Sequence, residues 1–135
     1  MIDPHLFLQV LCDFAAVKID FFFSFQHIMS VESRMDQMIK DHAVFVVSKS
    51  SCPFCRTAKN VLNKYDIPPE KMKVLEIERE RDCSKIQDYM QQLTGGRTVP
   101  RVFINGECIG GGNETSAAHK SGSLEKKLRA AGAIV

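Results

Sequence analysis

The sequence predicts an α/β protein with a four-stranded mixed sheet and helices on both faces. A near-continuous apolar run at residues 43–48 is typical of a strand that is buried on both sides, as in a parallel sheet. A helical pattern and a second strand follow, and strand, helix and strand at these lengths form a right-handed βαβ unit. The pair Asn105-Gly106 between two short apolar runs is a strong signal for an antiparallel hairpin. A parallel pair and a hairpin together make the sheet mixed.

The elements of the first half follow from periodicity and from turn residues. A helix is predicted from Glu32 to about Asp41, with one face formed by Met35, Met38, Ile39 and His42. After the strand at 43–48, a helix that begins at the cysteine pair runs to about Tyr65, with one face formed by Ala58, Val61, Leu62 and Tyr65. Residues 66–69 end it, because a proline disfavours helix at the residue before it. Residues 73–77 read as the second strand.

The second half of the sequence also predicts helices and strands separated by turn residues. Residues 78–81 are predicted to be a solvated charged turn, and Asp82 or Ser84 can cap the next helix. That helix stops at residues 95–96 and has one apolar face formed by Ile86, Tyr89, Met90 and Leu93. The hairpin strands are 101–104 and 107–109, and the chain returns to helix after the glycines at 110–112. Ser123 can cap a last helix, with Leu124, Leu128 and Ala131 facing inward and Gly132 at its end.

Composition narrows the class of protein. The chain has 135 residues with ordinary apolar and charged fractions, which predicts one domain of a soluble globular protein. The net charge of +2 is too small to indicate binding to nucleic acid or to a membrane surface. Five cysteines without regular spacing suit a reducing compartment with free thiols.

Residues 1–29 differ from the rest of the chain, and we expect a poorly ordered extension followed by a domain at 30–135. The extension is apolar but contains Asp3, Asp13, Lys18 and Asp20, and no run is long enough to span a membrane. Its charges are wrong for a signal peptide or a transit peptide. An early start codon before Met29 is one explanation, and a degenerate targeting or membrane-surface segment is the other.

The segment Cys52-Pro53-Phe54-Cys55, which contains a pair of cysteines, lies where a buried strand ends and a helix begins. Unpaired N–H groups and partial positive charge at a helix start stabilise a thiolate there, and the thiolate is the nucleophile. A half zinc site and a structural disulfide are alternatives for a lone C-x-x-C. The strand–helix context and the scattered positions of Cys12, Cys83 and Cys108 favour a redox motif. We expect Cys108 to be buried or inert and Cys83 to be exposed.

Four signatures in order resemble the dithiol glutaredoxins, which have a thioredoxin-like fold. They are the segment Lys49–Cys55, the triplet Gln87-Asp88-Tyr89, the segment Arg97–Pro100 and the pair Gly110-Gly111. The resemblance covers residues 31–133. Thioredoxin itself fits less well, because the chain has no tryptophan before its cysteine pair.

The resemblance implies a glutathione-dependent thiol–disulfide oxidoreductase that acts on glutathionylated or disulfide-bonded proteins. It implies that Cys52 is the nucleophile, that Cys55 is the resolving cysteine and that Pro100 follows a cis bond. Lys49, Gln87 and Arg97 would hold the glycine carboxylate of glutathione, Val99 its cysteinyl backbone and residues 112–114 its γ-glutamyl end. The full implied glutathione site is Lys49, Phe54, Gln87, Arg97, Thr98, Val99, Pro100, Gly111, Gly112, Asn113 and Glu114.

The chain departs from the family at three of these positions. Glu114 stands where Asp is common, Gly112 where Cys or another residue is common, and Phe54 where Tyr is common. The γ-glutamyl contact is therefore the weakest part of the implied site. The family also implies glutathione as co-substrate, no metal, a monomer and a cytoplasmic location, with mitochondria as a second possibility. A dimer that shares an iron–sulfur cluster through Cys52 and glutathione is the alternative function, although Pro53 argues against it.

Overall fold

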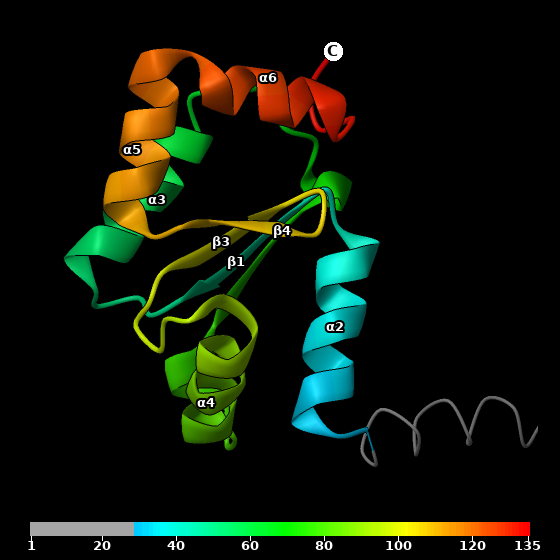
Figure 1. Cartoon of the computed structure of the whole chain (residues 1–135), viewed down its shortest axis with the longest axis vertical. Helices are drawn as coiled ribbons and strands as arrows, with labels where there is room; N and C mark the ends of the chain where they lie inside the picture. The colour runs from blue at the N-terminus through cyan, green and yellow to red at the C-terminus, as the bar shows by residue number, and fades with distance from the viewer. Residues whose placement is uncertain (1–28) are drawn as a thin grey trace, which may run out of the picture. The chain divides into compact units, whose positions relative to one another are not determined.

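The predicted four-stranded mixed sheet is present, and its strands lie in the order β2-β1-β3-β4 (Figure 1). The computed structural model describes residues 29–135, so the predicted extension at 1–29 lies almost entirely outside the described residues. The strands are β1 Val44–Ser48, β2 Met72–Glu76, β3 Arg101–Ile104 and β4 Glu107–Gly110. β1 pairs with β2 in parallel, and β3 pairs with β1 and β4 antiparallel. The predicted βαβ unit and hairpin are both present.

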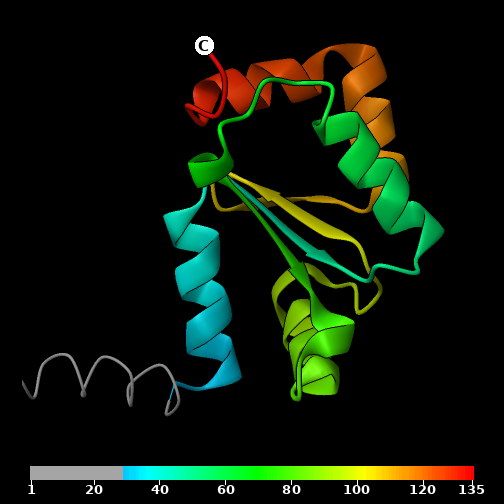
Figure 2. The same ribbon diagram turned by 180° about the vertical axis from the view of Figure 1, so that it is seen from behind.

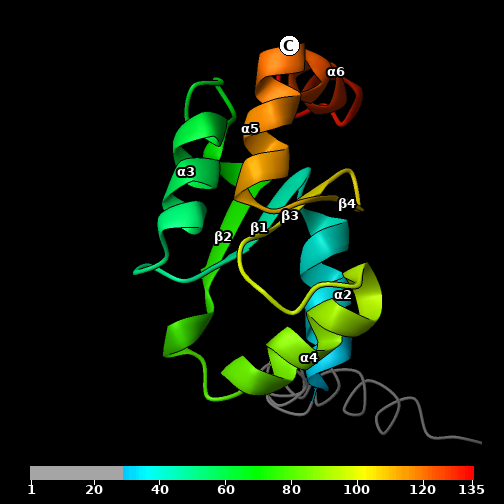
Figure 3. The same cartoon turned by 60° about the vertical axis from the view of Figure 1, so that its left-hand side comes forward.

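Among residues 29–135, five helices cover this sheet, three on one face and two on the other. Helices α3 (Pro53–Leu62), α5 (Gly112–Ser121) and α6 (Ser123–Ala130) lie on one side, and α2 (Val31–Asp41) and α4 (Cys83–Thr94) on the other. Figures 2 and 3 show the same two layers from behind and from the side. Two short 3₁₀ turns, Pro69–Lys71 and Ile77–Arg79, flank β2. Within residues 29–135 no helix is long and apolar enough to cross a bilayer.

Alternation along β1 divides the core into two clusters. Every residue of β1 is buried, and Val44 and Val46 pack with residues of α3 and α6. Phe45 and Val47 point the other way and pack with residues of α2 and α4. Successive side chains of a strand point to opposite faces, so one apolar strand supplies both sides of the core.

The hairpin turn has the backbone that its sequence predicts. Asn105 has φ 53° and Gly106 has φ 81°, which gives two successive left-handed residues between β3 and β4. This is the type I′ geometry, whose twist matches that of the flanking strands. Asn tolerates the left-handed region better than most residues, and Gly carries no Cβ to clash there.

Several boundaries differ from the predictions. The cap of α6 is Gly122 at φ 82°, which also ends α5, and Ser123 is the first helical residue. The helix α3 ends at Leu62, because the N–H groups of residues 64 and 65 bond three residues back rather than four. Ile77 belongs to a 3₁₀ turn rather than to the strand, and Leu93 is 46% exposed although the helical period placed it on the buried face.

Candidate active site

The two cysteines of the C-x-x-C segment occupy different environments at the start of α3. Cys52 is the N-cap residue and is half-buried, Pro53 is the first helical residue, and Cys55 is fully buried one turn further in. Both are free thiols. The Cys52 carbonyl accepts the first helical hydrogen bond, from the N–H of Arg56 at 3.1 Å. The pair therefore has a more accessible outer sulfur on Cys52 and a buried sulfur on Cys55.

The local backbone favours the thiolate of Cys52. Burial alone raises the pKa of this thiol, but hydrogen bonds from the N–H and the thiol of Cys55 and from the N–H of Phe54 hold it below its ordinary value. The positive charge of Lys49 acts in the same direction. Donors at a helix start therefore outweigh desolvation, as expected for a thiolate in the first turn.

The environment of Cys55 raises the pKa of its thiol instead of lowering it. Burial raises the pKa of its thiol, and the hydrogen bond that it donates to Cys52 raises the pKa further. The N–H of Lys49 donates to its sulfur at 3.4 Å and only partly offsets these effects. At neutral pH Cys55 is the proton-bearing partner and Cys52 the stronger candidate for nucleophile.

The loop before β3 lies directly against the outer sulfur. The Val99–Pro100 peptide bond is cis, as the resemblance implied. The carbonyl oxygen of Val99 lies 3.7 Å from the sulfur of Cys52, within the range of a weak S–H hydrogen bond. An extended chain seated on Cys52 would therefore meet the backbone of Val99.

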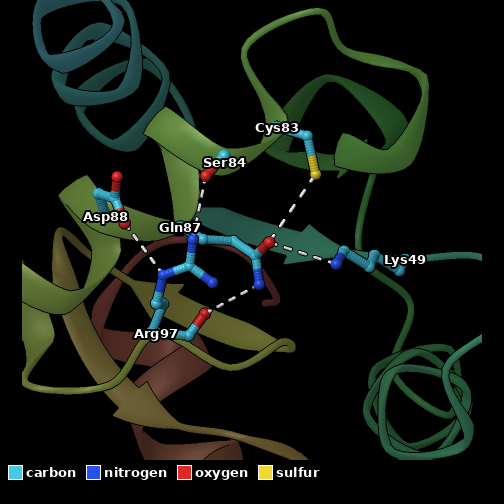
Figure 4. Close-up of polar contacts among 6 residues, drawn as sticks. All are labelled: Lys49, Cys83, Ser84, Gln87, Asp88 and Arg97. Carbon is cyan, nitrogen blue, oxygen red and sulfur yellow. Dashed lines mark hydrogen bonds and ion pairs between the residues drawn. The ribbon is translucent and has the colours of Figure 1, made fainter.

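The structure brings three of the implied glutathione residues together on one side of this loop (Figure 4). The side-chain oxygen of Gln87 accepts a hydrogen bond from Lys49 Nζ at 3.2 Å, and its side-chain nitrogen donates to the carbonyl of Arg97 at 3.2 Å. The Arg97 guanidinium donates to Asp88 at 3.0 Å and to Ser84 at 3.1 Å. Two cations are thus held in place by neutral and acidic neighbours, which suits recognition of a carboxylate.

A hollow lies on the other side of the loop. It has a volume of about 340 Å³ and is lined by Phe54, Thr98, Val99, Pro100, Arg101, Gly111, Gly112, Asn113 and Glu114. Phe54 is 54% exposed at its edge. The carboxylate of Glu114 accepts a hydrogen bond from the N–H of Gly111 at 3.1 Å, so it caps α5 as well as facing this hollow.

Close approach of two helices explains one departure from the family. A Cβ atom at Gly112 would lie 2.6 Å from the carbonyl oxygen of Phe54. That separation is far inside van der Waals contact with a backbone atom, so in this chain the starts of α3 and α5 require glycine at the contact.

Two contacts around the site escaped the sequence reasoning. Glu78, predicted to be solvated, accepts hydrogen bonds from the N–H and the hydroxyl of Ser50 in the loop before Cys52. These bonds, above all the one from the hydroxyl, hold the pKa of Glu78 below its ordinary value. Arg101 donates to both the carbonyl and the hydroxyl of Thr98 at 2.8 and 2.9 Å, and so braces the loop. Ser50 and Glu78 lie 28 residues apart in the sequence, so no local pattern indicates that they meet.

Two more cysteines occur among residues 29–135, and both pack on the α2–α4 face of the sheet. Cys108 is half-buried on the hairpin and packs against the core on the α2–α4 face, close to the prediction. Cys83 is also half-buried rather than exposed, because α4 turns it toward the same cluster, and its thiol lies 3.8 Å from the Gln87 side-chain oxygen. No group of three or more His, Cys, Asp or Glu side chains that fits a metal ion occurs among residues 29–135.

Comparisons with known proteins agree with this geometry. The glutaredoxin family model matches residues 44–109. Glutaredoxin-1 of Sus scrofa is 41% identical over 100 residues, which cover 74% of this chain and 94% of that protein. A glutaredoxin of Ricinus communis is 40% identical over 102 residues, covering 76% and 97%.

Solved structures of two relatives superpose on the same region. Oxidized glutaredoxin 2 from Chlamydomonas reinhardtii is 44% identical with a TM-score of 0.72, covering 77% of this chain and 95% of that one. A buckwheat glutaredoxin–glutathione complex is 31% identical with a TM-score of 0.73, covering 78% and 93%.

Proposed function

This chain belongs to the glutaredoxin family, the glutathione-dependent thiol–disulfide oxidoreductases, and we propose that it reduces protein–glutathione mixed disulfides and protein disulfides through Cys52. One observation carries the assignment of the nucleophile. Cys52 is the more accessible thiol of the pair and has its pKa lowered at the start of α3, while Cys55 is buried with its pKa raised. The complex of the buckwheat relative with glutathione supports glutathione as the co-substrate.

The first half-reaction needs only the outer cysteine. The Cys52 thiolate attacks the glutathione sulfur of the mixed disulfide, a Cys52–glutathione bond forms, and the protein thiolate leaves and takes a proton. A second glutathione thiolate then attacks the glutathione sulfur of that adduct. Oxidised glutathione leaves, and Cys52 departs as a thiolate. A leaving thiol with a low pKa departs faster, so the same backbone donors that activate Cys52 also speed its release.

The second route uses both cysteines. Cys52 attacks a protein disulfide, and Cys55 then attacks Cys52 to release the reduced protein and leave a Cys52–Cys55 disulfide. Two molecules of glutathione restore the dithiol. The hydrogen bond between the two thiols supports this route, because it places the sulfurs side by side before the bond forms.

Glutathione would lie along the loop at residues 97–100. We assign its glycine carboxylate to Lys49, Gln87 and Arg97, which the hydrogen bonds described above hold as one cluster. Its cysteinyl backbone would pair with Val99 beside the sulfur. Its γ-glutamyl end would enter the hollow at residues 111–114, with the free N–H groups at the start of α5 facing its carboxylate.

The proposal is tested by glutathione-dependent reduction of a glutathionylated peptide by wild type, Cys52→Ser and Cys55→Ser. We expect Cys52→Ser to be inactive and Cys55→Ser to retain turnover. With a disulfide-bonded peptide, both variants should lose the dithiol route. A folded, reduced wild type that turns over neither peptide would show that the assigned reaction is wrong.

A further inference from the structure

Ser48, the last residue of β1, is fully buried, and its hydroxyl has no hydrogen-bond partner of ordinary geometry within the described part of the chain. A buried hydroxyl without a partner lowers stability, so such a group calls for a physical explanation. The reaction proposed above does not use it.

Strand alternation places the Ser48 side chain beneath the cysteine pair. Val44 and Val46 pack on the α3 face of the sheet with Ala58, and Ser48 is the next residue on that face. Cys55 lies on the buried side of α3, just before Ala58. The N–H of the residue after Ser48 lies 3.4 Å from the Cys55 sulfur, so Ser48 adjoins that sulfur.

We propose that Ser48 is a positioning residue for the dithiol route, whose hydroxyl donates a hydrogen bond to the Cys55 thiolate when Cys55 resolves a mixed disulfide. The inference rests on the proposed function. The hydroxyl already lowers the pKa of the Cys55 thiol, although the two atoms do not meet in ordinary hydrogen-bond geometry. Burial raises the pKa of the Cys55 thiol, and the Ser48 hydroxyl acts against that rise.

The step served by Ser48 balances as follows. The Cys55 thiol loses its proton to solvent, and the resulting thiolate attacks the Cys52 sulfur of a Cys52–glutathione disulfide. The Cys52–Cys55 bond forms, the bond to glutathione breaks, and glutathione leaves as a thiolate that takes up a proton. The cysteine pair is oxidised and the glutathione is reduced. Attack by Cys52 on an incoming disulfide does not involve Ser48.

Other charged groups face the same buried space. Glu76 is the register partner of Ser48 on β2, and its carboxylate accepts a hydrogen bond from Lys59 of α3 at 2.8 Å. The second oxygen of that carboxylate is buried and has no partner in the described residues, so it is a second candidate acceptor for the Ser48 hydroxyl. Cys52 and Lys49 are further titratable groups close to Cys55. The experiment must therefore distinguish Cys55 from Glu76 as the acceptor.

Rapid mixing of reduced protein with excess oxidised glutathione separates the two steps. The second-order rate at low concentration reports attack by Cys52, and the plateau at saturation reports resolution by Cys55. Wild type, Ser48→Ala and Ser48→Thr are compared from about pH 6 to about pH 10, a range that spans thiol ionisation. Acid quenching and mass measurement identify the mixed disulfide and the internal disulfide.

We expect the difference in plateau rate between Ser48→Ala and wild type to depend on pH. If Ser48→Ala holds about a tenth as much Cys55 thiolate as wild type at low pH, that change alone slows resolution about tenfold. The more basic sulfur is about threefold more nucleophilic, so the net slowing is about threefold. As the pH approaches the raised pKa of Cys55, the difference in thiolate content narrows, so the gap between the two plateau rates should shrink. Ser48→Thr, which keeps the hydroxyl, should follow wild type, and the second-order rate should be the same in all three.

Two results would overturn the proposal. A plateau that changes by one constant factor at every pH would show a packing role only, and an unchanged plateau would assign the hydroxyl to Glu76. Failure of the proposed function would appear separately, as the absence of any second-order phase or of any adduct on Cys52 in wild type.

Discussion

Replacing Lys49 with Met tests whether this cation recognises glutathione. Met keeps the length of the side chain and removes its charge, and the change affects two properties of the site. It removes the ammonium group that lies 3.2 Å from the Gln87 side-chain oxygen, at the place assigned to the glycine carboxylate. It also removes one of the groups that offset burial and hold down the pKa of Cys52.

The size of the binding effect follows from Coulomb's law. Lys49 is half-buried at the surface, so its interaction with a carboxylate about 3 Å away is worth about 1.4 kcal/mol in a water-like dielectric. Ordering the lysine side chain lowers this to about 1 kcal/mol, since exposed ion pairs contribute up to about that much. A loss of about 1 kcal/mol corresponds to an increase of about fivefold in KM for the glutathionylated peptide.

The pH dependence provides an independent check. The pKa of Cys52 should rise in Lys49→Met, because the positive charge no longer favours the thiolate, although the N–H donors of Phe54 and Cys55 remain. The midpoint of the pH profile for kcat/KM should therefore move upward.

Steady-state kinetics at low and moderate salt measure both quantities. Lys126→Met on the outer surface of α6 is the matched control and should match wild type. The difference in KM should shrink as salt increases, because salt screens exposed charges. An unchanged KM at low salt, together with an unchanged pH midpoint, would refute the role assigned to Lys49.

Three further outcomes are expected. Alkylation of Cys52 should have a pH midpoint below that of a free thiol, and alkylation of Cys55 should lose its raised midpoint when the protein is unfolded. Mass mapping after brief iodoacetamide treatment measures both midpoints. Equal midpoints for the two cysteines in the folded protein would contradict the opposite pKa shifts assigned to them. In wild type, the hydroxyl of Tyr89 donates a hydrogen bond to Asp36 that joins α4 to α2 and raises the pKa of Tyr89 to about 12. Tyr89→Phe removes this bond, so urea unfolding should show a loss of about 0.5 to 1 kcal/mol in the free energy of unfolding. The loss should be present below the unfolded pKa near 10 and should disappear as pH rises through about 12. The Cβ added by Gly106→Ala meets no atom within 4 Å, so the loss of about 1 to 2 kcal/mol in the free energy of unfolding should come only from the left-handed backbone. An unchanged urea midpoint would contradict the left-handed geometry assigned to the turn.

Local pattern was sufficient for most of the fold. The order of strands and helices followed from apolar periodicity, and the hairpin followed from Asn105 and Gly106, because these signals depend on neighbours in sequence. The helical period wrongly predicted that Leu93 is buried, whereas it is exposed. Periodicity identifies one face of a helix, but it does not show how far the neighbouring elements extend over that face. Ser123 was misplaced as a cap because a left-handed glycine at 122 serves both helices at once.

The site was only partly accessible to the same reasoning. The cysteine pair and the loop at 97–100 could be identified from sequence because motif and resemblance name them. The supporting contacts could not, because Glu78 meets Ser50 only through the tertiary fold. Such contacts adjust ionisation and position, and they leave no signature at short sequence range.

The most direct test of the account locates the first covalent adduct. Reduced Cys55→Ser protein is mixed briefly with a glutathionylated peptide, and the cysteine that carries glutathione is identified by peptide mass mapping. The account predicts the adduct on Cys52, with Cys12, Cys83 and Cys108 unmodified at that time. An adduct that forms first on any of those three cysteines would contradict the assignment of Cys52 as the nucleophile.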